Sequence, residues 1–150
     1  VQTCALPILK MLEHYGISLC GKKVTVVGRS MVVGRPLSML LLKRHATITI
    51  CHTRTKDLEK VCREADILIA AAGKPRMITG DMAKENAVVV DVGINVDEEG
   101  RMCGDVDFES LAEKAAFITP VPGGVGGVTT SILAAHVLRG AKYLNGISKE

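Results

Sequence analysis

The feature that most constrains the fold is a set of short apolar runs, rich in β-branched residues, that recur about every 20 residues. Four of them stand out, at Lys23 to Val27, Thr47 to Cys51, Ile67 to Ala71 and Ala87 to Val92. Their interiors are almost continuously apolar, and a strand that is covered by helices on both faces has this pattern. The chain is therefore expected to form a parallel sheet.

The segments between these runs have helical spacing, so strands and helices alternate along the chain. Pro36 to Arg44 carries apolar residues at positions 37, 40 and 41, and Leu58 to Glu64 follows Thr55 or Asp57 as an N-cap. The order βαβαβ predicts an α/β fold of the Rossmann-like, doubly wound kind, with a mostly parallel sheet and helices on both faces.

The two ends of the chain are expected to add helices to this sheet. Apolar residues from Ile8 to Tyr15 have helical spacing, and Gly16 is a natural stop. A fifth strand is expected at Ala116 to Thr119, and a final helix from about Thr129 to Leu144. The loop between them, Pro120 to Gly127, is too rich in proline and glycine to be only a connection.

Length and composition favour one soluble domain that binds a small molecule. The 150 residues suit a single domain, and 47% hydrophobic with 23% charged residues is ordinary for a globular protein. The net charge of +3 is small and the charges are interleaved, which argues against nucleic acid as a partner. No apolar run reaches the roughly 18 residues of a membrane span, so no membrane association is expected.

The cysteine and histidine patterns favour a cytoplasmic protein without a metal site. The five cysteines form no CxxC pair, which argues against a disulfide framework and against zinc. The four histidines are too scattered along the chain to suggest a ligand set. The acidic run at positions 97 to 99 precedes Gly100 and is interpreted as a solvated turn without a catalytic role.

A glycine loop follows the first expected strand, running from Gly28 through Arg29 and Ser30 to Gly34. A loop at this place in a Rossmann fold holds a pyrophosphate, because glycine lets the backbone approach the phosphates and the next helix offers free N–H groups. The pattern is GxSxxxG and not the usual GxGxxG, so an ordinary tight turn is the alternative interpretation. The surrounding βαβ order favours the nucleotide site.

The end of the second expected strand favours NADP over NAD as the cofactor. NAD-specific domains place an acidic residue there to bind the ribose 2′-hydroxyl. Here the segment Cys51 to Thr55 has no carboxylate, and Arg29, Thr53 and Arg54 are potential donors to a 2′-phosphate. For Arg54 a solvated surface charge is an equally good interpretation.

Five stretches carry more specific motifs: Val27 to Pro36, Cys51 to Thr55, Asp91 to Asn95, Gly104 to Val106 and Ile118 to Gly126. Together they closely resemble the cofactor domain of the methylenetetrahydrofolate dehydrogenase/methenyltetrahydrofolate cyclohydrolase family. The resemblance implies an enzyme of one-carbon metabolism and purine biosynthesis, an oxidoreductase and hydrolase. It would oxidise 5,10-methylenetetrahydrofolate with NADP and hydrolyse the methenyl product to 10-formyltetrahydrofolate.

The resemblance also implies the binding residues. Arg29 and Thr53 would lie near the 2′-phosphate, Ile94 against the nicotinamide, and the loop from Pro122 onward would close over the folate. The cofactor contacts implied are Gly28, Arg29, Ser30, Gly34, Thr53, Ile94 and Thr129, and the substrate contacts are Pro122, Gly123, Gly124, Val125 and Gly126. Gly127-Val128 departs from the Pro-Met usual in the family, which bears on the stiffness of the loop.

Two other departures concern the first residues and the catalytic groups. The family's N-terminal domain supplies a tyrosine and a catalytic lysine, and no segment here matches it, so residues 8 to 150 are expected to be an NAD(P)-binding domain without catalytic residues. Residues 1 to 7 lack the family's Pro-Cys-Thr motif and are hypothesised to be a foreign or truncated junction.

The resemblance implies NADP and tetrahydrofolate derivatives as partners, and pairing into a homodimer. Two alternatives remain open. One is the cofactor domain of another two-domain NADP oxidoreductase, such as a shikimate-type dehydrogenase, against which the Thr119-Pro-Val-Pro-Gly-Gly motif weighs. The other is a non-catalytic nucleotide-binding module.

Overall fold

The computed structural model describes residues 2–147 and contains one five-stranded parallel sheet. Its strands are β1 (Lys23–Val27), β2 (Thr47–Cys51), β3 (Ile67–Ala70), β4 (Val88–Asp91) and β7 (Phe117–Ile118), in the order β2-β1-β3-β4-β7. A separate antiparallel hairpin pairs β5 (Asn95–Val96) with β6 (Met102–Cys103). The predicted doubly wound parallel sheet is confirmed.

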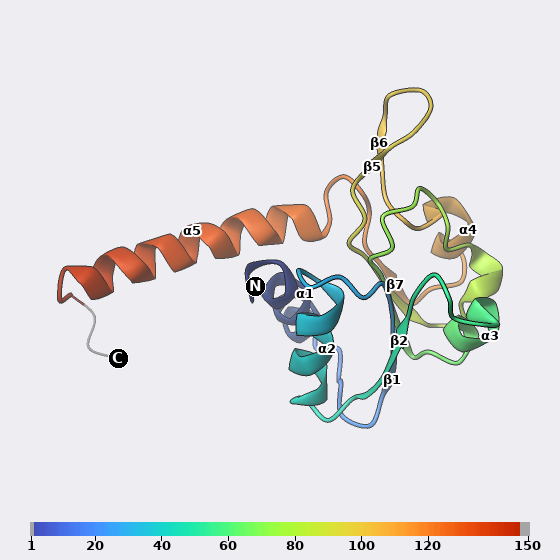
Figure 1. Ribbon diagram of the computed structural model, residues 1–150, viewed down its shortest axis with the longest axis horizontal. Helices are drawn as coiled ribbons and strands as arrows, with labels where there is room; N and C mark the ends of the chain where they lie inside the picture. Colours follow the sequence, from blue (N-terminus) through green and yellow to red (C-terminus); the bar gives the residue numbers. More distant parts are fainter. Residues whose placement is uncertain (1, 148–150) are drawn as a thin grey trace.

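The helices lie on both faces of this sheet, as Figure 1 shows. They are α1 (Gln2–His14), α2 (Gly34–Leu42), α3 (Leu58–Arg63), the 3-10 helix η1 (Gly80–Met82), α4 (Phe108–Ala112) and α5 (Val125–Leu144). Helices α1 and α2 cover one face, and α3, η1 and α4 cover the other. Over residues 2–147, no helix is both long and apolar enough to cross a membrane.

Two hydrophobic clusters, one on each face, explain why the central strands are apolar without alternation. Val24 and Val26 of β1 pack with α1 and α2, whereas Val27 packs on the α3 side. The same division separates Ile67 and Ile69 of β3 from Leu68 and Ala70. Successive side chains of a strand point to opposite faces, so both sets must be apolar when helices cover both faces. Strand β2 lies at the edge and is more exposed than predicted.

The strand order creates a crevice between β1 and β3. The chain leaves β1 toward one edge to form β2, then crosses back to form β3 on the other side of β1. In such sheets the connections after the two central strands turn to opposite faces, and a ligand-binding crevice opens at their carboxyl ends. Gly28 follows β1 and Ala71 follows β3, and the Ala71 N–H donates to the Val27 carbonyl at 2.8 Å.

The terminal helices are longer than the spacing predicted. Helix α1 begins at Gln2, within residues 1 to 7, and includes Pro7, because Ala5 and Ile8 are fully buried in the core. Helix α5 begins at Val125 and not at Thr129, because Val125 is buried against the α1 side of the sheet. The foreign origin of residues 1 to 7 stays a prediction, and re-sequencing of the source gene tests it. Val1 and residues 148–150 lie outside the described part of the chain.

Two elements extend away from the body of the molecule. Figure 1 shows the distal part of α5 projecting from the sheet. It also shows the β5–β6 hairpin standing out from the sheet, beyond the carboxyl ends of the strands. The acidic run predicted as a solvated turn forms the tip of this hairpin. There the Asp97 carboxylate accepts the N–H groups of Glu99 and Arg101 at 3.0 and 2.9 Å, and these bonds lower its pKa.

An ion pair at the amino ends of β1 and β3 makes stability depend on pH. The Asp66 carboxylate bonds the Lys84 ammonium and accepts the Lys23 N–H, and these bonds lower its pKa. A lowered pKa means that the stabilisation is present above the unfolded value of about 4 and disappears as the pH falls through the folded value. We therefore expect Asp66→Asn to reduce the free energy of unfolding at pH 7, and we expect its difference from wild type to shrink as the pH falls below about 4.

Urea unfolding at pH 7, 5, 4 and 3 measures this effect. Asp57→Asn is the matched control, because Asp57 is exposed and its side chain caps no helix. A difference between wild type and Asp66→Asn that stays constant down to pH 3 would contradict the prediction.

Candidate cofactor and substrate site

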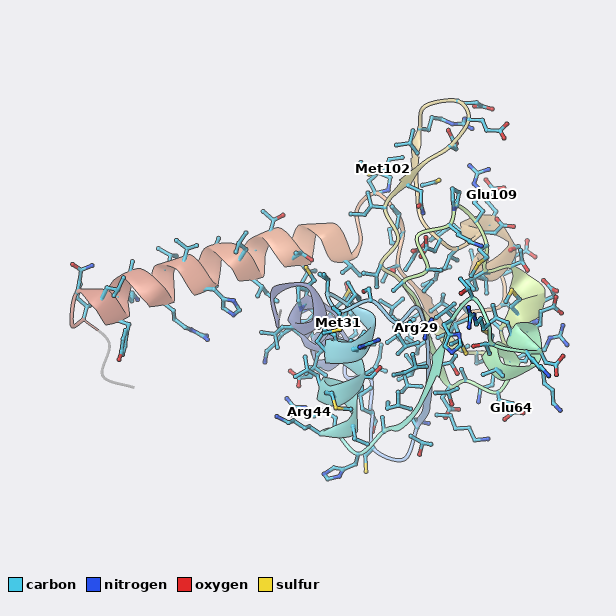
Figure 2. The ribbon with its side chains drawn as sticks, viewed as in Figure 1. Arg29, Met31, Arg44, Glu64, Met102 and Glu109 are labelled. Carbon is cyan, nitrogen blue, oxygen red and sulfur yellow. The ribbon has the colours of Figure 1, made fainter. Side chains whose placement is uncertain are left out.

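A cavity of about 360 Å³ lies at the carboxyl ends of β1, β2 and β3, where the fold opens its crevice. We call it the first cavity. Its lining residues are Val27, Gly28, Arg29, Ser30, His52, Thr53, Thr55, Leu58, Ala71, Ala72, Lys74 and Met77. Figure 2 labels Arg29, which lies between the α2 and α3 sides of the molecule.

The backbone of the glycine loop leaves no room for a side chain at Gly28. Its φ is +135°, which L side chains rarely adopt, and an added Cβ would lie 2.1 Å from the Ala71 carbonyl oxygen. The Gly28 N–H donates to the Cys51 carbonyl at 2.9 Å. The loop is thereby held between the ends of β2 and β3, with its backbone facing the cavity.

Ser30 and Gly34 connect this loop tightly to the start of α2. The Ser30 hydroxyl accepts the N–H groups of Val33 and Gly34 at 3.0 and 3.4 Å. Gly34 is buried, and a Cβ there would lie 2.1 Å from the Gly28 carbonyl oxygen. The positive end of the α2 dipole is therefore next to the loop, where it would stabilise a bound phosphate.

The charges around the first cavity favour the binding of an anionic ligand. Arg29 and Lys74 line it and are exposed, and no carboxylate is among its lining residues. Thr53 and Thr55 also line the cavity, and the Thr55 hydroxyl oxygen accepts the His52 N–H at 2.9 Å. Arg54, the third potential donor, does not line the cavity.

A second cavity of about 570 Å³ lies beyond the carboxyl end of β4. It is enclosed by the segment after β4, by the proline- and glycine-rich loop and by the first turns of α5. Its lining residues are Cys4, Val33, Asp91, Val92, Gly93, Ile94, Met102, Pro120, Val121, Pro122, Gly123, Gly124, Val125, Gly126, Gly127, Thr129 and Thr130.

The loop that forms one wall of the second cavity is compact. A Cβ at Gly124 would lie 2.4 Å from the Pro120 carbonyl oxygen, and Gly123 has a φ of +104°. The Val121–Pro122 peptide bond is cis. Helix α5 starts directly after this loop, so free N–H groups of its first turn are near the cavity.

Two buried carboxylates lie next to the cavities, and Asp91 also lines the second one. Asp91, at the end of β4, accepts the N–H groups of Gly93, Asp105 and Val106 at 2.8 to 3.0 Å. Its burial raises the pKa of the carboxyl group, although these hydrogen bonds act in the opposite direction. Asp105 is fully buried and accepts hydrogen bonds from backbone and side-chain N–H groups.

The structure divides the predicted site residues between the two cavities. Gly28, Arg29, Ser30 and Thr53 line the first, and Ile94, Thr129 and the five residues from Pro122 to Gly126 line the second. Gly34 lines neither and packs the loop against α2. Contacts of all these residues with ligands stay predictions.

Several lining residues had no signal in the sequence that marked them as part of a site. They include Lys74 and Met77 in the first cavity and Cys4 and Met102 in the second. Lys74 is exposed and also borders the first cavity. Among the described residues, no group of His, Cys, Asp and Glu side chains is arranged to hold a metal ion.

Comparison with known proteins settles the family. Residues 3–145 match the family model described as tetrahydrofolate dehydrogenase/cyclohydrolase, NAD(P)-binding domain. The chain belongs to this family. The tetrahydrofolate dehydrogenase/cyclohydrolase resemblance found in the motifs is thus confirmed, and the match weighs against a shikimate-type dehydrogenase.

Relatives in this family are similar along most of the chain. The bifunctional protein FolD of Clostridioides difficile is 59% identical over 138 residues, which is 92% of this chain and 48% of the relative. That of Alkaliphilus oremlandii is 58% identical over 142 residues, 95% of this chain and 50% of the relative. The chain therefore spans about half the length of the curated relatives it matches.

Solved structures in the tetrahydrofolate dehydrogenase/cyclohydrolase family have the same fold. The bifunctional enzyme FolD from Campylobacter jejuni has a TM-score of 0.90 at 46% identity, over 93% of this chain and 50% of the other. The Trypanosoma brucei enzyme, solved with NADP cofactor and inhibitor, has a TM-score of 0.84 at 40% identity, over 91% and 48%.

Proposed function

We propose that the chain is the NADP-binding part of a bifunctional 5,10-methylenetetrahydrofolate dehydrogenase and 5,10-methenyltetrahydrofolate cyclohydrolase. The observation that carries the proposal is the placement of the two cavities at one edge of the sheet. The first has a glycine loop, a helix start and basic side chains for a phosphorylated nucleotide. The second has an apolar wall and a compact proline- and glycine-rich loop for two stacked rings.

The residues of the first cavity fit NADP better than NAD. Gly28 leaves its backbone open where a pyrophosphate would approach, and α2 begins beside it. Arg29 and Thr53 supply donors for a 2′-phosphate, and no lining carboxylate would repel it. The Trypanosoma brucei relative was solved with NADP, which supports the same cofactor here.

The second cavity supports hydride transfer between a folate and the nicotinamide ring. Bound NADP would supply the hydride acceptor, and the protein would bring the folate methylene carbon next to it. Ile94 is 71% exposed at the cavity and offers an apolar surface for the nicotinamide. The loop from Pro122 to Gly126 and Thr129 would hold the folate and the adjoining end of the cofactor.

Calorimetric titration with NADP and NAD tests the cofactor assignment. We expect NADP to bind more tightly, and Arg29→Ala to weaken NADP binding by about 1 to 3 kcal/mol, the range for a charge-assisted hydrogen bond. NAD binding should change little, because NAD has no 2′-phosphate. Arg54→Ala is the matched control, since Arg54 carries the same charge nearby but lies outside the cavity.

Equal losses for NADP and NAD in Arg29→Ala would disprove the assignment of Arg29 to the 2′-phosphate. No binding of either nucleotide to a chain that is folded by circular dichroism would contradict the proposed function.

We also propose that the catalytic lysine and tyrosine belong to a second half that packs on α5. Helix α5 has exposed apolar side chains along its distal part, including Leu133, Val137 and Leu138, which are 49%, 64% and 64% exposed. An apolar cavity of about 680 Å³ continues this surface between α1, β7 and α5. Apolar surface of this extent on one element favours a covering domain. The relatives are long enough to provide one.

Pairing into a homodimer in the cytoplasm completes the proposal. The paired hairpin residues Val96 and Met102 are 67% and 53% exposed, so the hairpin presents apolar side chains for pairing. All five cysteines are free thiols, as is usual in a reducing compartment. Sedimentation at micromolar concentration measures the oligomeric state, and a monomer there would argue against the dimer.

A further inference from the structure

The Asp105 carboxylate is held by neutral donors only. It is 0% exposed, and none of the ion pairs among the described residues includes it. One oxygen accepts the N–H groups of Ala72 and Gly73 at 2.5 and 2.9 Å. The other accepts the Lys74 N–H at 2.9 Å and the Asn95 side-chain amide at 2.8 Å. A buried carboxylate with four donors fixes the position of every group that bonds it.

These donors come from the walls of two different cavities. Ala72 and Lys74 belong to the segment after β3, which lines the first cavity. Asn95 follows Ile94, which lines the second. Asp105 therefore connects the wall of the nucleotide cavity to the wall of the cavity assigned to the nicotinamide and folate.

Asp91 holds Asp105 in place from below. Its two oxygens accept the N–H groups of Asp105 and Val106 at 3.0 and 2.9 Å, and one of them also accepts the Gly93 N–H. Asp91 ends β4, a central strand of the sheet. The link between the two cavity walls is thus anchored to a strand that has neighbours on both sides in the sheet.

The two carboxylates also explain two glycines of the sequence motifs. A Cβ at Gly93 would lie 2.4 Å from the Asp105 carboxyl carbon, and a Cβ at Gly104 would lie 1.8 Å from an Asp91 carboxylate oxygen. Each glycine leaves the space that the carboxylate of the other segment occupies. The motifs Asp91-Val-Gly and Gly104-Asp therefore form one interlocked structure.

We propose that Asp105 is a positioning residue that keeps the phosphate-side and nicotinamide-side walls of the dinucleotide site in register. This inference rests on the proposed function and adds a role for a residue that touches neither cavity. Its action is on the dinucleotide as a whole, because it orients backbone segments on both sides and contacts no phosphate. Loss of the Asp105 carboxylate should thus reduce the affinities for NADP and NAD by the same factor, whereas loss of Arg29 should reduce only the affinity for NADP.

The first test is Asp105→Asn in the full chain, titrated with NADP and NAD. The amide has nearly the same size, but its NH₂ group replaces an acceptor with a donor that faces backbone N–H groups. We expect a loss of about tenfold or more in affinity for both nucleotides, with an unchanged NADP/NAD ratio. Asp107→Asn is the matched control, because the Asp107 side chain caps no helix and lies two residues away.

A second variant separates the contributions of the two walls to binding, and it removes fewer hydrogen bonds than Asp105→Asn. Asn95→Ala removes one donor to Asp105 and leaves the three backbone bonds intact. We expect it to weaken NADP severalfold and to leave the affinity for 2′,5′-ADP, which fills only the phosphate side, within about twofold. Asp105→Asn should weaken both ligands.

Hydrogen exchange of the free chain provides a readout that needs no nucleotide. The amides of Ala72, Gly73 and Lys74 should exchange at least about tenfold faster in Asp105→Asn than in wild type. Amides on the α1 side of the core should exchange at the wild-type rate, and Asp107→Asn should leave all of these rates unchanged. If wild type binds neither nucleotide, the proposed function fails, while this measurement still tests the link. Unchanged exchange at these amides, an altered NADP/NAD ratio in Asp105→Asn, or equal losses of NADP and 2′,5′-ADP in Asn95→Ala would overturn the proposal.

Discussion

Gly28→Ala should lose more than about a hundredfold in affinity for both nucleotides, because strain of about 1 to 3 kcal/mol at a positive φ adds to a steric clash. The added Cβ would lie 2.1 Å from the Ala71 carbonyl oxygen, at a φ of +135°. Relief of this clash requires the loop to move away from β3, and the backbone surface for the pyrophosphate moves with it. Calorimetry with NADP and NAD measures the loss.

Gly140→Ala is the control for this substitution. Gly140 lies inside α5, and nothing is within 4 Å of its added Cβ, so alanine should be neutral or stabilising by up to about 1 kcal/mol. Circular dichroism and Tm of Gly28→Ala show whether the sheet persists. A folded Gly28→Ala chain that binds NADP as tightly as wild type would refute the assignment of the glycine loop.

Joining the chain to the N-terminal half of the Clostridioides difficile relative should produce folate-dependent reduction of NADP, whereas the chain alone should give none. The family resemblance assigns the catalytic lysine to that half, and this chain spans about half of the relative's length. The fusion would also cover the apolar face of α5, so a rise in Tm should accompany turnover. Absorbance of NADPH on addition of 5,10-methylenetetrahydrofolate measures the activity.

The same fusion carrying Arg29→Ala is the control, because it should raise the KM for NADP and leave the KM for the folate nearly unchanged. Turnover by the 150-residue chain alone would contradict the placement of the catalytic groups in the other half. A fusion that folds and binds NADP but shows no turnover would do the same.

The strands were predicted well because their signal is local. The limits of β1 and β2 match the predicted ones, and β3, β4 and β7 each end within one residue of the prediction. A strand that is buried on both faces requires a continuous apolar run, and such a run can be recognised in a single sequence. The edge strand β2 is partly exposed, because neighbours on only one side cover it, and its position in the sheet is set by topology.

The elements that the sequence did not predict depend on contacts between distant segments. The hairpin strands β5 and β6 have two residues each, and α4 has five, too few for a periodic pattern. Gly126 and Gly127 disfavour a helix start, yet buried Val125 brings α5 forward to include them. Asp105 is recognisable in its motif, but its partners lie more than 30 residues earlier in three of four cases.

The arrangement of α5 has a mechanical consequence. The helix has 20 residues, and its first turns line the second cavity while its distal part projects from the body. A rigid helix of this size is about 30 Å long, so a 5° tilt displaces its far end by about 2.6 Å. A domain that packs on the far end would therefore set the angle of the first turn, and with it the shape of the loop from Pro120 to Gly124. The helix would act as a lever whose short arm lies at the second cavity.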